Sequence, residues 1–182
     1  MFRFIRLVRF LVLALAASSV WAASATSADE GQPAVWKSRE VILTYAGFTN
    51  RYSCEGLRDK VEEALATLGA RSDMRVSPRA CSGHGKPERF PSVRIELSTL
   101  TPAPERAAGT VEARWKTVRL SGPGKLTHSE CELAEQIQHE ILPLFTTRNV
   151  KARTNCVPNQ ESAGDITLTL DVLVPTTEKA TR

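Results

Sequence analysis

The spacing of apolar and polar residues changes several times along the chain, and the changes recur in the same order in its two halves. Residues 41–45 (VILTY) are β-branched and aromatic and predict a strand. From Cys54, apolar residues recur at helical spacing and predict a helix that ends at Gly69, because glycine commonly terminates helices. The basic segment 74–77 and the alternating segment 93–97 predict two further strands. The first half is therefore expected to be β-α-β-β.

The second half repeats this order of elements. Residues 118–120 predict a strand, residues 133–144 repeat the apolar phase of the first helix, and residues 149–153 and 166–172 predict two strands. Val41 and Val118 are 77 positions apart, and so are Cys54 and Cys131. Two Trp-Lys pairs stand at similar places in the two halves. This correspondence indicates a duplicated unit.

The ends of the second helix carry signals of their own. Ser129 and Glu132 fit the S-x-x-E pattern of a capping box and predict the start of the helix. Pro143 should end or kink the helix, because proline has no N–H group to donate.

These elements predict an α+β protein of two tandem β-α-β-β units that form one largely antiparallel sheet with both helices on one face. Within each unit we expect the strand order 1-3-2. The strand that contains Pro78 then lies at an edge, where proline is tolerated. We assign the units to residues 35–100 and 111–174, with a linker at 101–110 and a polar tail at 175–182.

The N-terminus resembles an export signal. Three arginines precede a short apolar run, and small residues follow, so residues 1–23 predict a cleaved secretory signal peptide. The apolar run is too short to span a bilayer, and residues 24–34 are expected to be flexible. We therefore expect a protein of the periplasm or the exterior, with no membrane span after cleavage.

Removal of the signal changes the charge of the protein. The whole chain has a formal charge of +4, and three of its arginines lie in the predicted signal, which leaves +1. This overall charge does not favour a nucleic-acid partner, because such binding requires clustered basic residues.

Four cysteines remain after the signal: Cys54, Cys81, Cys131 and Cys156. An even number in an exported protein predicts two disulfides, and four cysteines allow three pairings. The repeated positions favour Cys54–Cys81 and Cys131–Cys156. Each bond would tie the start of a helix to the end of a strand.

Candidate chemistry is sparse. His128, Glu135 and His139 could hold a metal ion, and Glu135 and His139 are spaced to share a helix face. The alternative reading is that these are surface residues beside a structural disulfide. Hydrolase motifs are missing, so a hydrolase is a weaker hypothesis, and we expect no cofactor.

The predicted edge strands are basic. Arg75 and Arg79 mark the first, and Lys151 and Arg153 mark the second. Such residues could bind a partner, or they could defend an exposed edge against aggregation. The leading expectation is a non-enzymatic binding or interaction module whose partner is an unidentified protein or envelope component, and the alternative is a metal-handling protein that uses His128 and His139.

Overall fold

The computed structural model describes residues 31–82, 85–105, 107–122, 125–154, 156–157, 160 and 166–176. The strands in this part of the chain are β1 (Gln32–Thr44), β2 (Arg75–Arg79), β3 (Ser92–Pro102), β4 (Val111–Arg119), β5 (Thr147–Arg153) and β6 (Thr167–Pro175). The first helix is α1 (Cys54–Thr67), and the second helical segment contains α2 (Cys131–Gln136). The first half below means β1 to β3 with α1, and the second half means β4 to β6 with α2.

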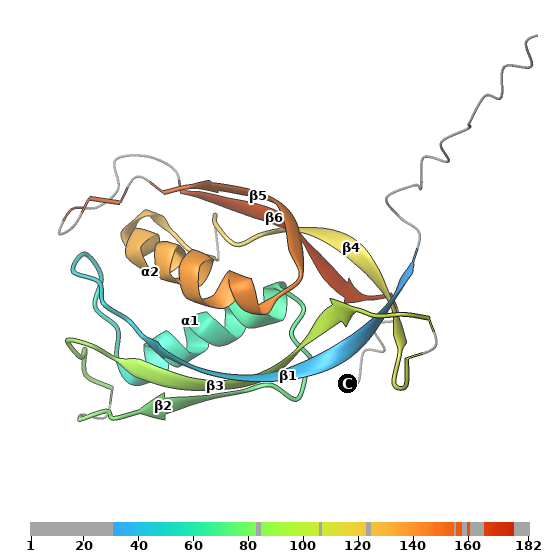
Figure 1. The fold of residues 1–182 in the computed structure, drawn as a ribbon. Coiled ribbons are helices and arrows are strands. Elements are labelled where there is room, and N and C mark those ends of the chain that lie inside the picture. Colours follow the sequence, from blue (N-terminus) through green and yellow to red (C-terminus); the bar gives the residue numbers. More distant parts are fainter. Residues whose placement is uncertain are drawn as a thin grey trace, which may run out of the picture.

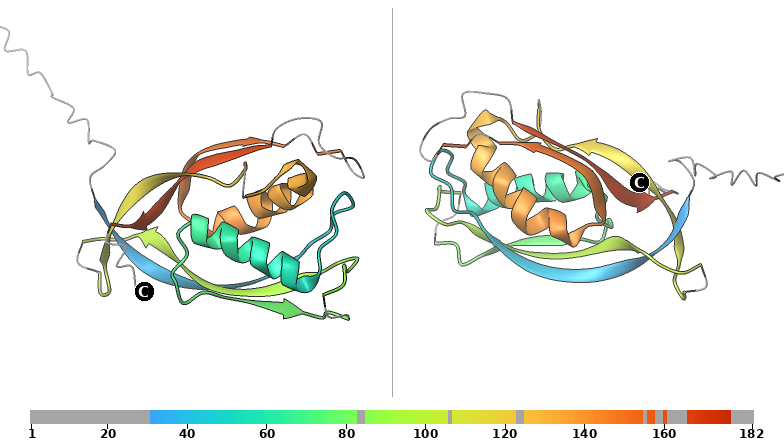
Figure 2. Two further views of the ribbon diagram at one scale, coloured as in Figure 1. Left: turned by 180° about the vertical axis from the view of Figure 1, so that it is seen from behind. Right: turned by 45° about the horizontal axis from the view of Figure 1, so that its top comes forward.

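The strands form one antiparallel sheet in the order β2-β3-β1-β4-β6-β5. This confirms the predicted α+β class, and the order within each half is the predicted 1-3-2. β2 with Pro78 lies at one edge and β5 at the other. The halves join through only three residue pairs between β1 and β4. The sheet curves around this junction, and both helices lie inside the curve (Figures 1 and 2).

β1 is longer than the sequence pattern indicates. It begins at Gln32, and its residues from Ala34 to Thr44 pair with β3. Most side chains of residues 37–40 are exposed, which is why this part of the strand lacks an apolar pattern. Ala34 is fully buried, so the end of the segment expected to be flexible belongs to the sheet. The predicted signal peptide and residues 24–30 lie outside the described residues.

α1 ends at the predicted glycine. Ser53 caps its start, because the Ser53 Oγ accepts a hydrogen bond from the Gly56 N–H at 3.0 Å. Gly69 has a left-handed φ of 79°, and the Ala70 N–H donates to the Leu65 carbonyl at 3.0 Å, as in a Schellman motif. The buried face of the helix carries Leu57, Val61 and Leu65, with Leu68 at the C-cap.

The second helical segment is less regular than the pattern predicts. It begins with a 3₁₀ turn (His128–Glu130), continues through α2, widens to a π-helical turn (Ile137–Ile141) and closes with a 3₁₀ turn (Leu142–Leu144). Pro143 lies in the last turn, so the predicted termination of the helix near this proline is confirmed. After the π turn, Phe145 is buried, whereas Leu144 is only partly buried.

The predicted capping box of Ser129 and Glu132 is wrong. The helical segment begins after Thr127, and the Thr127 N–H donates to the Glu130 carboxylate at 2.9 Å. The sequences THSE and SECE both fit the capping pattern, so the local sequence does not decide between them. Glu132 is engaged instead by the loop that follows β1.

One large core fills the space between the sheet and the two helices. It includes Leu43, Ile95, Leu133 and Leu170, and both halves of the sheet contribute to it. A second, smaller cluster contains Ala34, Leu100, Ala113 and Leu173, with Trp36, Val111 and Trp115 packed against it.

The predicted disulfides Cys54–Cys81 and Cys131–Cys156 are both present. Cys54 and Cys131 open α1 and α2, and Cys81 follows β2. Two disulfides and no free cysteine among the described residues are consistent with an oxidising compartment outside the cytoplasm.

Candidate interaction surface

A group of positive side chains lies on the side of the second half that faces away from the helices. In the register of the sheet, the cations of β5 stand opposite polar residues of β6: Arg148 opposite Asp171, Lys151 opposite Thr169 and Arg153 opposite Thr167. Thr169 also pairs with Arg119 of β4. Side chains alternate along a strand, and Leu168 and Leu170 are buried, so residues 167, 169 and 171 face outward. Arg119, Arg148, Lys151 and Arg153 together are called the cationic face.

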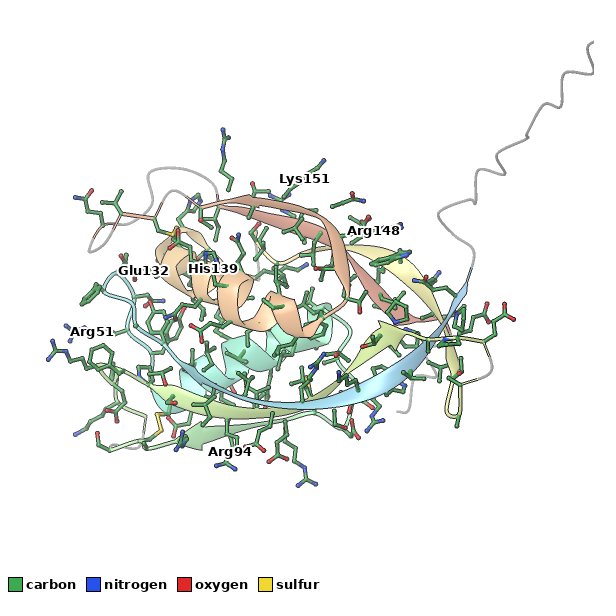
Figure 3. The ribbon with its side chains drawn as sticks, in the orientation of Figure 1. Arg51, Arg94, Glu132, His139, Arg148 and Lys151 are labelled. Atoms are coloured by element: carbon green, nitrogen blue, oxygen red, sulfur yellow. A yellow bond between two sulfur atoms is a disulfide. The ribbon has the colours of Figure 1, made fainter. Side chains whose placement is uncertain are left out.

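A β-bulge brings the β5 cations onto one side of the sheet. Simple alternation would place Arg148 and Lys151 on opposite faces, because they are three residues apart. Between Arg148 and Lys151 the register shifts: β5 advances by three residues while β6 advances by two, from Asp171 to Thr169. Both cations therefore stand opposite outward-facing residues of β6. Asn149 has a φ of 53°, a left-handed conformation that asparagine tolerates better than most residues. Figure 3 shows Arg148 and Lys151 along the outer side of β5 and β6.

Arg148 is held in place by an aromatic ring and a carboxylate. Its guanidinium carbon lies 4.2 Å from the centre of the Trp115 ring, and its Nε lies 3.4 Å from an oxygen of Asp171. Asp171 also accepts hydrogen bonds from the Thr117 hydroxyl at 2.6 Å and the Asn149 amide at 2.7 Å. These two hydrogen bonds and Arg148 lower the pKa of the Asp171 carboxyl, so Asp171 stays ionised.

An open groove of about 450 Å³ runs over this surface. Hydroxyl groups of Thr117 and Thr169 line it together with Lys151 and the exposed side chain of Val150. Lys151 supplies a positive charge, whereas Asp171 is already satisfied by its three partners. The Thr117 hydroxyl already donates to Asp171, so the groove offers an anionic ligand the charge of Lys151 and the hydroxyl of Thr169.

The predicted cations of the other edge strand are in different surroundings. Arg75 and Arg79 are exposed on β2, but Arg75 pairs in register with Glu96 of β3. Nearby, Arg94 forms an ion pair with Glu40 at 3.2 Å. Charges of both signs alternate here, so the described residues of the first half form no counterpart of the cationic face.

The predicted metal ligands are spread along one helical segment. His128 and His139 are eleven residues apart, which corresponds to roughly 16 Å along a helix, so one ion could not contact both. His139 and Glu135 do line one groove of about 330 Å³, with Glu132 and Glu140. Figure 3 shows Glu132 and His139 on the same helical segment. The one cluster of three potential ligands among the described residues is Cys131, Glu135 and Cys156, whose sulfurs are joined in a disulfide.

The sequence pointed to part of this surface only. The sequence predicts Lys151 and Arg153 as interaction residues in a basic edge segment that begins at Arg148, whereas it does not single out Arg119. Asn149 was the available signal, because asparagine between two cations of a strand can mark a bulge.

No protein-family model matches the chain, and neither a curated protein nor a solved structure matches it significantly. The described residues contain no helix long and apolar enough to cross a membrane. The assignment of a function therefore rests on the surface of the molecule.

Proposed function

We propose that the protein is an exported, non-enzymatic binding module that recognises an anionic protein or envelope component in the periplasm or outside the cell. Residues 1–23 would act as the cleaved signal peptide. The two disulfides support this location, because oxidising compartments form and maintain such bonds. Mass spectrometry of the protein recovered from the periplasm tests it, and a chain that retains residues 1–23 would contradict it.

The cationic face is the observation that carries this proposal. Arg119, Lys151 and Arg153 are exposed, and Arg148 is held by Trp115 and Asp171. These four cations outnumber the single carboxylate of Asp171 beside them, and a surplus of one sign attracts ligands of the opposite sign and speeds their association. The bulge at Asn149 and Pro78 in β2 interrupt both edges of the sheet, which favours the face over the strand edges as the binding surface.

We further propose that the two halves derive from one duplicated β-α-β-β unit. The equivalent strand orders and disulfides support this origin. So do two corresponding contacts, Arg71 with Trp36 and Arg148 with Trp115. In this view the cationic face is a feature that only the second unit acquired.

The binding proposal is tested by titrating the mature, oxidised protein with poly-L-glutamate in a calorimeter. We expect saturable binding that weakens with added salt. Replacing Lys151→Gln and Arg153→Gln together should weaken it at least about fivefold, since each rim charge contributes up to about 1 kcal/mol. The pair Arg75→Gln and Arg94→Gln removes the same charge from the first half and serves as the control. The proposal would be refuted if the two double variants lost equal amounts of affinity for poly-L-glutamate, or if the wild-type protein did not bind it at all.

A further inference from the structure

The end of the molecule at which β1 finishes exposes three apolar side chains. Phe48 is 57% exposed, Phe90 51% and Val157 48%, more than any other large apolar side chain among the described residues. Ile42 and Val150, at 39% and 44%, lie instead on strands. Exposed apolar side chains that gather in one place commonly mark an interaction site.

Hydrogen bonds between loops bring these three side chains to the same end. The Tyr45 N–H donates to the Pro91 carbonyl and the Glu88 N–H to the Tyr52 carbonyl, both at 2.9 Å. The Thr49 hydroxyl donates to the Gln160 carbonyl at 3.1 Å. Loop residues 45–53, loop residues 85–91 and the described residues 156, 157 and 160 are called the loop end.

Positive side chains lie in the same loops as the exposed phenylalanines, and Phe48 also lines a groove with Glu132, Glu135 and Glu140. Arg51, Lys86 and Arg89 are exposed in the same loops, and Arg79 is exposed where β2 ends. The Arg89 guanidinium carbon lies 5.3 Å from the centre of the Phe90 ring. Figure 3 shows Arg51 at this extremity of the molecule. The one carboxylate described in loop 85–91, that of Glu88, accepts hydrogen bonds from the Ser82 hydroxyl at 2.9 Å.

The loop end is fixed by the rest of the fold. The four disulfide-bonded cysteines adjoin these loops, at Cys54, Cys81, Cys131 and Cys156. The Glu132 carboxylate of α2 accepts the N–H groups of Phe48 and Thr49 at 2.7 and 2.9 Å. Phe48 is therefore presented to solvent by a supported loop. Such a loop loses less conformational entropy on binding than a flexible one.

We propose that the loop end binds the surface of an anionic lipid bilayer. Phe48, Phe90 and Val157 enter the boundary between headgroups and acyl chains, while Arg51, Lys86 and Arg89 of the same loops contact lipid phosphates. Apolar anchors flanked by Arg and Lys have the composition of peripheral membrane-binding sites. The apolar groups project from three separate loops, an arrangement that suits a deformable, extended surface. This site is separate from the cationic face and does not depend on the proposed function.

Vesicle sedimentation with the mature, oxidised protein tests this inference. The vesicles contain phosphatidylcholine either alone or mixed with phosphatidylglycerol. We expect binding to the mixed vesicles and little binding to phosphatidylcholine. Phe48→Ser with Phe90→Ser should reduce the partition coefficient at least about tenfold. Ile42→Ser with Val150→Ser makes the same chemical change on the strands and should leave the partition coefficient within about twofold.

Charge variants separate the loop end from the cationic face. Arg51→Gln with Arg89→Gln should weaken binding to the mixed vesicles at least about fivefold, and added salt should weaken it further. Lys151→Gln with Arg153→Gln should leave vesicle binding nearly unchanged while it impairs binding of poly-L-glutamate. The inference is overturned if the wild-type protein does not bind the vesicles. It is also overturned if the serine variants bind like wild type, or if the Lys151 and Arg153 changes alone abolish binding.

Discussion

The guanidinium of Arg148 lies over the ring of Trp115 at 4.2 Å, and that of Arg71 lies over Trp36 at 5.6 Å. In each half, the tryptophan of a Trp-Lys pair meets an arginine that follows the helix: Arg71 precedes β2, whereas Arg148 lies within β5. Each arginine also pairs with an aspartate, Asp171 in one half and Asp73 in the other. Both arginine–tryptophan contacts lie on the side of the sheet that faces away from the helices.

A double-mutant cycle measures the contact in the second half. Trp115→Leu and Arg148→Gln should be coupled by about 0.5–2 kcal/mol in the free energy of unfolding, the range of cation–π pairs. Urea denaturation of the two single variants and the double variant gives this value. A cycle of Trp115→Leu with Arg119→Gln is the control and should give a coupling near zero. Equal coupling in the two cycles would show that the pair has no specific interaction.

The buried carboxylate of Glu130 makes stability depend on pH. Burial on its own would raise the pKa of Glu130, but hydrogen bonds from the Thr127 N–H, Lys60 and the Tyr52 hydroxyl outweigh burial and lower it. A lowered folded-state pKa stabilises the protein above the ordinary value of 4.5, and this contribution is lost as pH falls through the lowered value. Glu130→Gln should cost about 1–2 kcal/mol near neutral pH.

The test compares urea midpoints of wild type and Glu130→Gln at about pH 7 and about pH 3. The difference between the two proteins should shrink in acid, because below about pH 4.5 the Glu130 carboxylate of the unfolded wild-type chain takes up a proton and the advantage of the ionised folded form falls. Glu135→Gln, which changes a partly exposed carboxylate on the same helix, is the control. A difference that stays constant with pH would mean that the charge of Glu130 contributes nothing.

Glu132 holds the loop after β1 through two backbone hydrogen bonds. Glu132→Ala should accelerate amide hydrogen exchange at Phe48 and Thr49 at least about tenfold, because hydrogen bonds to a charged group contribute about 1.5–3 kcal/mol. Glu140→Ala alters an exposed carboxylate that lines the same groove as Glu132 and His139. It should leave the exchange rates of both amides unchanged. Unchanged exchange in Glu132→Ala would show that other contacts fix this loop.

Each disulfide should contribute comparably to stability, because the two bonds close spans of 27 and 25 residues. In the chain-entropy model, Cys54→Ser with Cys81→Ser lowers the free energy of unfolding by about 3 kcal/mol, and the Cys131 and Cys156 pair does the same. Guanidinium denaturation of both double variants checks this. Domains of this size have a free energy of unfolding of about 5–15 kcal/mol. If the value for the wild type lies at the lower end, the variant with all four cysteines replaced should be largely unfolded. A fourfold variant as stable as wild type would contradict the model.

The elements that pack against the core were predictable from the sequence. Leu57, Val61 and Leu65 repeat at helical spacing because one helix face is buried, and Gly69 occupies a left-handed position that favours glycine. The repeated cysteine positions were sufficient to favour the observed disulfides among three pairings. Burial leaves a periodic trace in the sequence, whereas the predicted strand order placed the strand that contains Pro78 at an edge.

The surfaces were not predictable in the same way. The cationic face depends on the bulge at Asn149, which reverses the alternation between Arg148 and Lys151. Phe48 and Phe90 lie in loops, where exposed apolar residues follow no period. The choice of Thr127 over Ser129 as helix cap depended on tertiary contacts of Glu130 and Glu132. The cap in particular depends on residues that are distant in the chain, because Glu130 bonds to Tyr52 and Glu132 to Thr49.

The disulfides join cysteines that are consecutive in the chain, first with second and third with fourth. In the proposed export, the N-terminal part of the chain would emerge first, so Cys54 and Cys81 would both be available before Cys131 appears. An oxidase that links thiols in their order of emergence would thus produce the native pairing directly. Neither bond would need to be broken and exchanged, and maturation would not require a disulfide isomerase.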